Sequence, residues 1–97
     1  MSIIDVWTFR LAGDVDEGIF LEADRRVQER YMLSHPGFLR RTTARGDDGE
    51  WAVIMLWRSR DEAEAPEGAL RDDPVVAAFA SLLDPSSVGV HRYATLD

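Results

Sequence analysis

Residues 38–58, with the sequence FLRRTTARGDDGEWAVIMLWR, decide the fold of this chain. Phe38–Arg45 and residues 51–58 are rich in β-branched and aromatic side chains, and they flank a short polar segment that contains Asp48-Gly49. Two such runs around an Asp-Gly turn are typical of a β-hairpin. The sequence therefore predicts two antiparallel strands joined by a loop of about four or five residues.

The segments on either side of the hairpin alternate between strand and helix patterns. Residues 3–11 have the composition of a strand, and from residue 16 to 33 the apolar side chains recur at helical spacing. A second helix begins near Ser59 with the spacing of a capping box, and Pro66-Glu67-Gly68 is expected to interrupt it. Asp73-Pro74 then combines an N-cap residue with a proline at the first helical position, which predicts that the helix restarts.

The last strand completes a recognisable order. Residues 88–96 follow a turn and have strand composition. The order β-α-β-β-α-β predicts an α+β, ferredoxin-like domain that spans residues 1–97. In this architecture the antiparallel sheet carries its helices on one face.

One predicted strand is apolar on both faces. From Trp51 to Trp57 every side chain is apolar, including Ala52, Ile54 and Leu56 at alternate positions. The helices cover only one face of such a sheet, and an exposed apolar patch of this size is uncommon on a monomer. The sequence therefore predicts a homodimer in which two sheets pack face to face.

Composition and charge exclude several kinds of chemistry. The 97 residues contain no cysteine, and all eleven basic residues are arginine. A thiolate nucleophile, a sulfur-ligated metal and a lysine Schiff base are therefore excluded. The net charge of −7 disfavours nucleic-acid binding, and no apolar run approaches the roughly 20 residues that cross a bilayer. We therefore expect a soluble, cytoplasmic protein whose partners are a second copy of itself and a small molecule, with neither nucleic acid nor membrane.

With these elements assigned, the chain resembles the antibiotic-biosynthesis monooxygenase type of dimeric α+β barrel. The resemblance rests on HPGF at 35–38, WRSRDEA at 57–63 and DPVVAAF at 73–79. It implies a dimer of two packed sheets, with a small-molecule pocket between each sheet and its own helices. The family includes cofactor-free oxygenases of aromatic polyketides, haem-degrading oxygenases and many proteins without known activity.

The resemblance implies a small cofactor-free monooxygenase or tailoring enzyme that acts on an aromatic or polyketide-like molecule. Substrates that form carbanions react with oxygen directly, so the protein needs only to deprotonate, orient and desolvate them. Two alternatives stay open. One is a non-catalytic dimer that binds a small apolar ligand or serves as an accessory subunit, and the other is a non-oxidative cyclase or isomerase on the same fold.

Three residues are candidates for the chemistry. Trp57 matches the tryptophan that lines the pocket in haem-degrading and some polyketide-oxidising relatives, and it also suits a core aromatic. Asp5 interrupts an apolar strand, where it either faces the pocket as a base or pairs with an arginine near the solvated strand start. His91 lies in the middle of the last strand, either as an acid–base group or as a structural histidine.

The candidate binding residues are mostly apolar and aromatic. They are Trp7, Phe20, Val27, Tyr31, Met55 and Phe79. Trp7 equally suits a role in the core, and Tyr31 either donates a hydrogen bond to a ligand carbonyl or belongs to the buried stripe of its helix. His35 and His91 are far apart in the sequence and have no helix-spaced partner, so no metal-site signature is present and no metal is expected.

Haem degradation is not expected. Resembling haem oxygenases combine an asparagine on the first strand, a tryptophan before the second helix and an iron-ligating histidine on that helix. Only the tryptophan is matched, by Trp57, while Trp7 and Phe79 occupy the other two places. No histidine, cysteine or methionine occurs between Ser59 and Val90, so a bound haem would lack its proximal ligand. Titration with haemin should therefore give no sharp Soret band of one-to-one stoichiometry, and such a band, abolished by a single substitution, would contradict this prediction.

Overall fold

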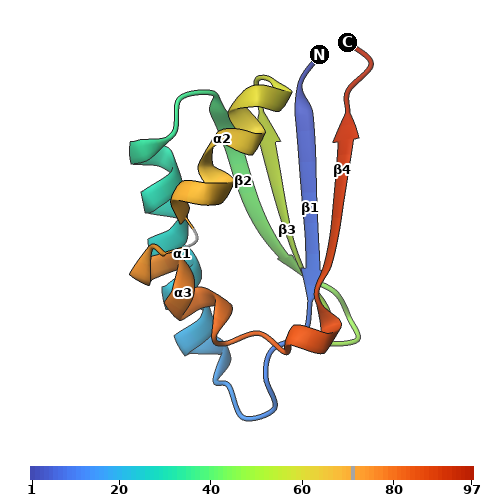
Figure 1. Ribbon diagram of the computed structural model, residues 1–97. Coiled ribbons are helices and arrows are strands. Elements are labelled where there is room, and N and C mark those ends of the chain that lie inside the picture. Colours follow the sequence, from blue (N-terminus) through green and yellow to red (C-terminus); the bar gives the residue numbers. More distant parts are fainter. Residues whose placement is uncertain (71) are drawn as a thin grey trace.

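The alternating strands and the hairpin form a four-stranded sheet in the computed structural model (Figure 1). The structure describes residues 1–70 and 72–97, without the side chains of residues 31–34 and 67–70. The strands are β1 (Ile3–Phe9), β2 (Phe38–Arg45), β3 (Trp51–Trp57) and β4 (Gly89–Ala94). They lie in the order β2-β3-β1-β4, and all neighbouring pairs are antiparallel. The predicted ferredoxin-like α+β fold is confirmed.

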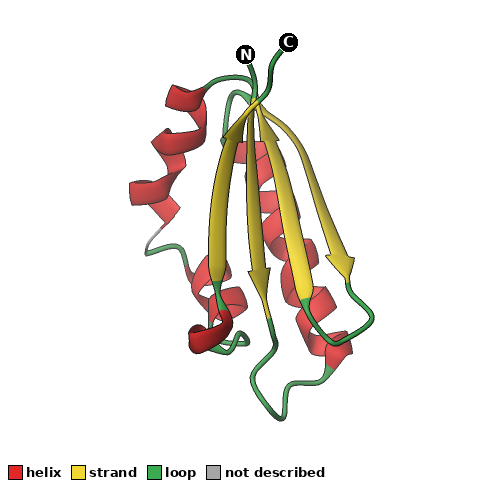
Figure 2. Ribbon diagram, turned by 90° about the vertical axis from the view of Figure 1, so that its right-hand side faces the viewer, coloured by secondary structure: helices red, strands yellow, loops and turns green. Residues whose placement is uncertain are grey.

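The helices all lie on one side of this sheet, and its other face is bare (Figure 2). They are α1 (Glu17–Ser34), α2 (Arg60–Leu70) and α3 (Pro74–Ala80). Asp16 accepts a hydrogen bond from the Gly18 amide at 2.6 Å, and Asp73 accepts one from the Val75 amide at 2.8 Å. These carboxylates satisfy amide groups that have no partner in the first turn of a helix. In the described part of the chain, no helix has both the length and the apolar character needed to cross a membrane.

The predicted interruption of the second helix at residues 66–68 is wrong. Pro66 lies inside α2, which continues to Leu70. Proline removes one helical hydrogen bond, but Ala63 and Pro66 are both buried, and such packing provides most of the stability of a short helix. The N-cap bond of the predicted capping box is present, since the Ser59 hydroxyl accepts from the Glu62 amide at 3.3 Å. The same hydroxyl also donates to the Glu62 carboxylate at 3.0 Å. The predicted restart at Asp73-Pro74 is confirmed.

The turn between α1 and β2 requires a glycine. Gly37 has a φ of +85°, a backbone angle that residues other than glycine rarely adopt. A Cβ atom at this position would lie 2.0 Å from Oε2 of Glu62 on α2. The Gly37 carbonyl also accepts a hydrogen bond from the Arg58 amide at 2.8 Å. The HPGF turn is therefore packed tightly against the start of the second helix.

A bulge in β2 determines which of its side chains face the helices. Pairing with β3 is regular from Arg45 opposite Trp51 to Arg41 opposite Met55, and it shifts between Phe38 and Arg40. Residues directly opposite each other in a sheet point to the same face. Arg41 therefore shares the helix-covered face with Met55 and is buried. Without the bulge, alternation from Phe38 would place Arg40 there instead.

The core lies between the sheet and the helices. Phe9, Phe20 and Trp57 are the largest fully buried side chains. Phe20 packs against Phe9 with ring centroids 5.8 Å apart and against Trp51 at 4.8 Å, in edge-on and tilted arrangements. Such contacts add to the stabilisation that burial of these rings provides.

The bare face of the sheet has an apolar centre. Ile4 lies opposite Leu56, and Val6 lies opposite Ile54, which is 39% exposed. We call these four residues, together with His91 and Tyr93 on the neighbouring strand β4, the bare face. An apolar surface of this kind favours association with another molecule.

We expect the protein to sediment with the mass of two chains at micromolar concentration. The reason is that packing against a second copy removes the apolar bare face from water. Obligate interfaces of this type often bury more than about 2,000 Å². Leu56→Asp should dissociate or unfold the dimer because it places a charge inside the contact. Leu21→Asp is the matched control, because Leu21 is exposed on α1, away from the sheet. A wild-type mass of one chain would contradict the dimer.

Candidate functional site

A small cavity of about 190 Å³ lies between the sheet and the helices α1 and α3. The sheet contributes Trp7, Phe9, Arg41, Val53 and Met55 to its lining. Val27 on α1, Val76, Phe79 and Ala80 on α3, and Leu83 after α3 complete it. An apolar cavity of about 150 Å³ is large enough to bind benzene. This cavity is therefore matched in size to one substituted aromatic ring.

The cavity reaches solvent beside Trp7. This residue is 38% exposed, whereas Phe9, two positions along the same face of β1, is buried. Both rings line the cavity. Trp7 therefore stands at the mouth and Phe9 in the interior.

Arg41 is the only charged side chain among the described lining residues. Its side chain is 3% exposed, and its Nη2 atom lies 2.7 Å from Oδ1 of Asp24 on α1. Thr43 is close to both groups, since its hydroxyl donates to Asp24 Oδ1 at 2.9 Å and accepts from Arg41 Nη1 at 3.4 Å. The guanidinium carbon also lies 5.7 Å from the centre of the Phe79 ring, within range of a cation–π interaction. A desolvated cation is thus fixed in an otherwise apolar wall.

Asp5 is buried on the helix-covered side of the sheet, but it does not line this cavity. Its two carboxylate oxygens accept hydrogen bonds from Nε of Arg92 at 2.7 Å and from Nη2 at 3.1 Å. Arg92 Nη1 also lies 3.6 Å from Oε1 of Glu64, so this network joins β1 and β4 to α2. A two-pronged contact of this kind fixes the relative orientation of the two side chains. Of the two interpretations of Asp5, the structure shows the pairing with an arginine, in a buried rather than a solvated position.

Trp57 and His91 do not line the cavity, and His91 lies on the opposite face of the sheet from Asp5. Trp57 is buried beside Phe38, with ring centroids 5.5 Å apart, and is not among the lining residues. His91 is exposed on the bare face, where its ring stacks on Tyr93 at 6.5 Å. The structure therefore does not bring the three predicted catalytic residues together in one site.

His35 packs near Trp57 at the end of α1, with ring centroids 6.5 Å apart. Burial lowers the pKa of His35, and the negative charge of Asp73 partly opposes this effect. The imidazole is therefore held mainly in its neutral form at neutral pH. The described residues contain no group of three or more acidic, histidine or cysteine side chains with the geometry of a metal site.

Four of the six predicted binding residues surround the cavity, namely Trp7, Val27, Met55 and Phe79. Phe20 lies behind the wall in the core, with its ring centroid 5.5 Å from that of Phe79. The side chain of Tyr31 lies outside the described residues. Sequence reasoning missed Arg41, although counting the strand register back from the hairpin turn places it opposite Met55.

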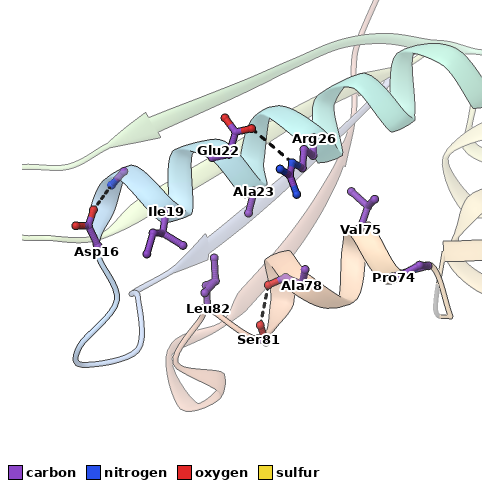
Figure 3. A pocket seen from close by; sticks show the side chains of 11 residues that line it. Asp16, Ile19, Glu22, Ala23, Arg26, Pro74, Val75, Ala78, Ser81 and Leu82 are labelled. Atoms are coloured by element: carbon purple, nitrogen blue, oxygen red, sulfur yellow. Dashed lines mark hydrogen bonds and ion pairs between the residues drawn. The ribbon is translucent and has the colours of Figure 1, made fainter.

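A larger groove lies on the outer surface between α1 and α3 (Figure 3). It has a volume of about 840 Å³, and Ile19, Val75 and Leu82 contribute apolar walls. Ile19 is mostly exposed, so this groove is open to water. Its size alone does not make it a better site than the cavity with Arg41, whose wall includes side chains of the apolar core.

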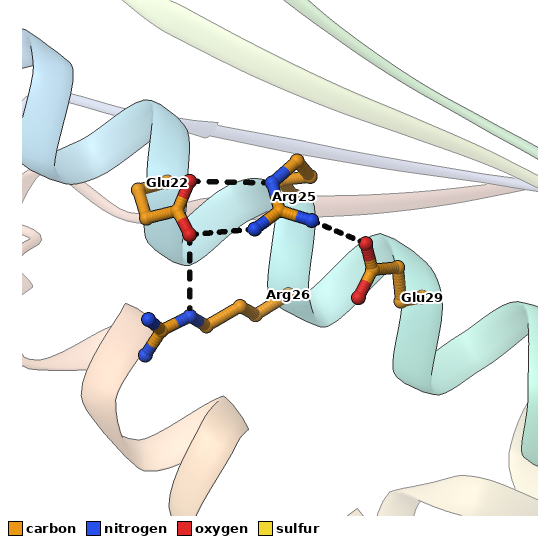
Figure 4. Close-up of polar contacts among 4 residues, drawn as sticks. All are labelled: Glu22, Arg25, Arg26 and Glu29. Carbon is orange, nitrogen blue, oxygen red and sulfur yellow. Dashed lines mark hydrogen bonds and ion pairs between the residues drawn. The ribbon is translucent and has the colours of Figure 1, made fainter.

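Charged side chains along this face of α1 pair with each other (Figure 4). Arg25 bridges Glu22, at 2.6 Å, and Glu29, while Arg26 Nε lies 3.5 Å from Glu22. The hydrogen bond from Arg25 lowers the pKa of Glu22 and raises that of Arg25. Solvated pairs of this kind contribute little to affinity or stability, so the cavity with Arg41 remains the candidate site.

Comparisons with known proteins identify the fold. No family model matches the sequence, and no curated protein matches it. SnoaB, a cofactor-independent oxygenase from Streptomyces nogalater, has a similar structure, with a TM-score of 0.76 and 20% identity over 99% of this chain and 94% of that chain. The chain has the antibiotic-biosynthesis monooxygenase fold.

Two further structures with this fold cover the chain almost completely. A candidate antibiotic biosynthesis monooxygenase from Caulobacter crescentus CB15 matches with a TM-score of 0.82 and 16% identity, over 99% of this chain and 91% of that chain. A second candidate antibiotic biosynthesis monooxygenase, from Nitrosomonas europaea, matches with a TM-score of 0.79 and 18% identity, over 98% of this chain and 90% of that chain. The resemblance inferred from the three sequence motifs is therefore confirmed at the level of the fold.

Asp5→Asn should lower the free energy of unfolding by about 2–3 kcal/mol, since it removes the buried negative charge that compensates Arg92. The loss is moderate because Arg92 is partly exposed to water. Urea denaturation at fixed protein concentration measures this change. Asp48→Asn, in the exposed pair with Arg10, is the control and should leave stability unchanged. Equal stability of both variants would contradict a stabilising role for the Asp5–Arg92 pair.

Proposed function

We propose that this protein is a cofactor-free oxygenase that oxidises a small aromatic molecule in the cavity between its sheet and its helices. The observation that carries this proposal is a mostly apolar cavity, of the size of one ring, in which Arg41 is the one charged side chain among the described lining residues. Apolar walls with a few fixed polar groups are typical of small-molecule sites. The cofactor-independent activity of SnoaB, which shares the fold, supports the same reaction class.

The proposed reaction needs an aromatic ring with an acidic hydroxyl and molecular oxygen. Loss of the hydroxyl proton gives an anion whose charge extends onto a ring carbon. This anion transfers one electron to O₂, and the two radicals combine to form a carbon–oxygen bond. Loss of a proton from that carbon and cleavage of the O–O bond then release water and leave a carbonyl group. Each turnover consumes one O₂, and the substrate loses two hydrogens and gains one oxygen.

The described lining residues position and desolvate the substrate. They include no carboxylate and no imidazole, so a substrate acidic enough to lose its proton to water suits this site. Phe9 and Phe79 pack edge-on against each other, with ring centroids 6.0 Å apart, so a bound ring would meet them as adjoining walls. Restricted orientation of this kind lowers the entropic part of a barrier. A cavity of about 190 Å³ favours one ring over the fused rings of a polyketide.

The proposed assembly is a dimer of two copies joined through their bare faces. The cavity lies on the opposite side of the sheet, between the sheet and the helices. Each protomer would therefore keep a complete cavity of its own, and His91 would lie in the contact between the copies.

We expect oxygen uptake above the protein-free rate with acidic single-ring phenols or quinols, and one labelled oxygen atom in the product when ¹⁸O₂ is supplied. Val76→Phe should abolish the uptake because it fills the cavity. Val75→Phe is the matched control, since the neighbouring valine lines the outer groove instead, and it should retain the rate.

Binding without oxygen uptake would contradict the oxygenase and favour the non-catalytic ligand-binding dimer. Conversion of a substrate in the absence of oxygen would favour the cyclase or isomerase. An oxygen electrode and mass spectrometry of the product distinguish these outcomes.

A further inference from the structure

We propose that Arg41 binds the ionised oxygen of the ligand, so that the cavity selects acidic single-ring phenols and enols over neutral rings of equal size. This inference rests on the proposed function for its substrate class. It assigns a specificity-determining role to a residue that the sequence patterns did not single out.

The donor capacity of Arg41 supports this role. A guanidinium group has five N–H donors and no acceptor. In the part of the chain that the structure describes, its contacts are those of Nη2 with Asp24 and of Nη1 with Thr43. These contacts leave donors for an oxygen atom of a ligand, and the side chain lines the cavity.

The direction of the ion pair favours a negative ligand. Arg41 lines the cavity, whereas its partner Asp24 does not. The pair therefore presents its positive end to the ligand and keeps its negative end on the α1 side. Because the Arg41 side chain is removed from water, a charge-assisted hydrogen bond from it is stronger than the same bond at the surface.

The surroundings of Arg41 also fix its position before a ligand binds. Asp24 and Thr43 hold the guanidinium from one side, and the ring of Phe79 lies against it. A donor that is already oriented stabilises charge without reorganisation when that charge develops. Phe79 lines the same cavity, so a ligand ring in contact with Phe79 is adjacent to this donor.

The test compares two ligands under anaerobic conditions: 4-nitrophenol, whose ionised form absorbs visible light, and its neutral methyl ether, 4-nitroanisole. At a pH where the phenol is ionised, wild-type protein should bind it at least about tenfold more tightly than the ether, as calorimetry can measure. The visible band should also appear at lower pH for bound than for free 4-nitrophenol.

The main variant combines Arg41→Met with Asp24→Asn, because removal of only one partner would leave a buried charge without compensation. It should bind the ether as the wild type does, which also shows that it is folded, and should lose the preference for the phenolate. Arg45→Met is the matched control, since Arg45 lies on the same strand and face but is exposed and outside the cavity lining. This control should keep the preference.

A phenolate preference that persists in the double variant would overturn the inference, and so would its absence in the wild type. Failure of the wild type to bind either compound would also overturn it. If Arg41-dependent binding occurs without oxygen uptake from any tested phenol, the inference stands and the proposed oxygenase activity is wrong. If oxygen uptake is equal in the wild type and the double variant, the oxygenase proposal stands and the role of Arg41 is wrong.

Discussion

The register of β3 against its two neighbours determines the composition of the helix-covered side of the sheet. Side chains alternate between faces, so a shift of one residue would turn every side chain of a strand to the opposite face. In the observed register, Met55 lies opposite both Asp5 and Arg41, and Val53 lies opposite both Trp7 and Thr43. The cavity wall, both buried acid–arginine pairs and the position of the largest core rings depend on this alignment.

Two ion pairs occupy the covered side of the sheet on either side of β3. Arg41 on β2 pairs with a carboxylate from α1, and Asp5 on β1 pairs with a guanidinium from β4. Both use arginine, whose planar group donates several hydrogen bonds in fixed directions and is less strongly hydrated than an ammonium group. The two pairs differ in their surroundings, since one borders the cavity and the other joins packed strands to α2. Burial of a charge therefore does not by itself identify a functional group in this protein.

Local patterns predicted most of the fold, because each of them has a local physical cause. The hairpin follows from its turn residues, and the start of α3 follows from the Asp73 cap and Pro74. The interruption expected at Pro66 is absent because burial against the sheet, a tertiary effect, outweighs one lost hydrogen bond. The resemblance to a family indicated the location of the cavity, but alternation alone did not reveal Arg41, since a bulge after Phe38 changes the phase of β2.

The pairing of distant elements also limited what the sequence could indicate about Asp5 and His91. A strand pattern alone does not show that Arg92 lies beside Asp5, because 87 positions separate them in the chain. The orientation of His91 likewise depends on which residue of β4 pairs with Val6.

The short helix α3 contributes three residues to the cavity, and none of its residues is fully buried. Substitutions on this helix can therefore alter the dimensions of the cavity while the sheet and its large core rings stay in place. In evolutionary terms, α3 offers a way to change the size of the cavity that leaves its core walls, such as Phe9, Val53 and Met55, in place. Chains with this fold can thus come to accept different molecules through substitutions on α3 alone, while the sheet and its core stay folded.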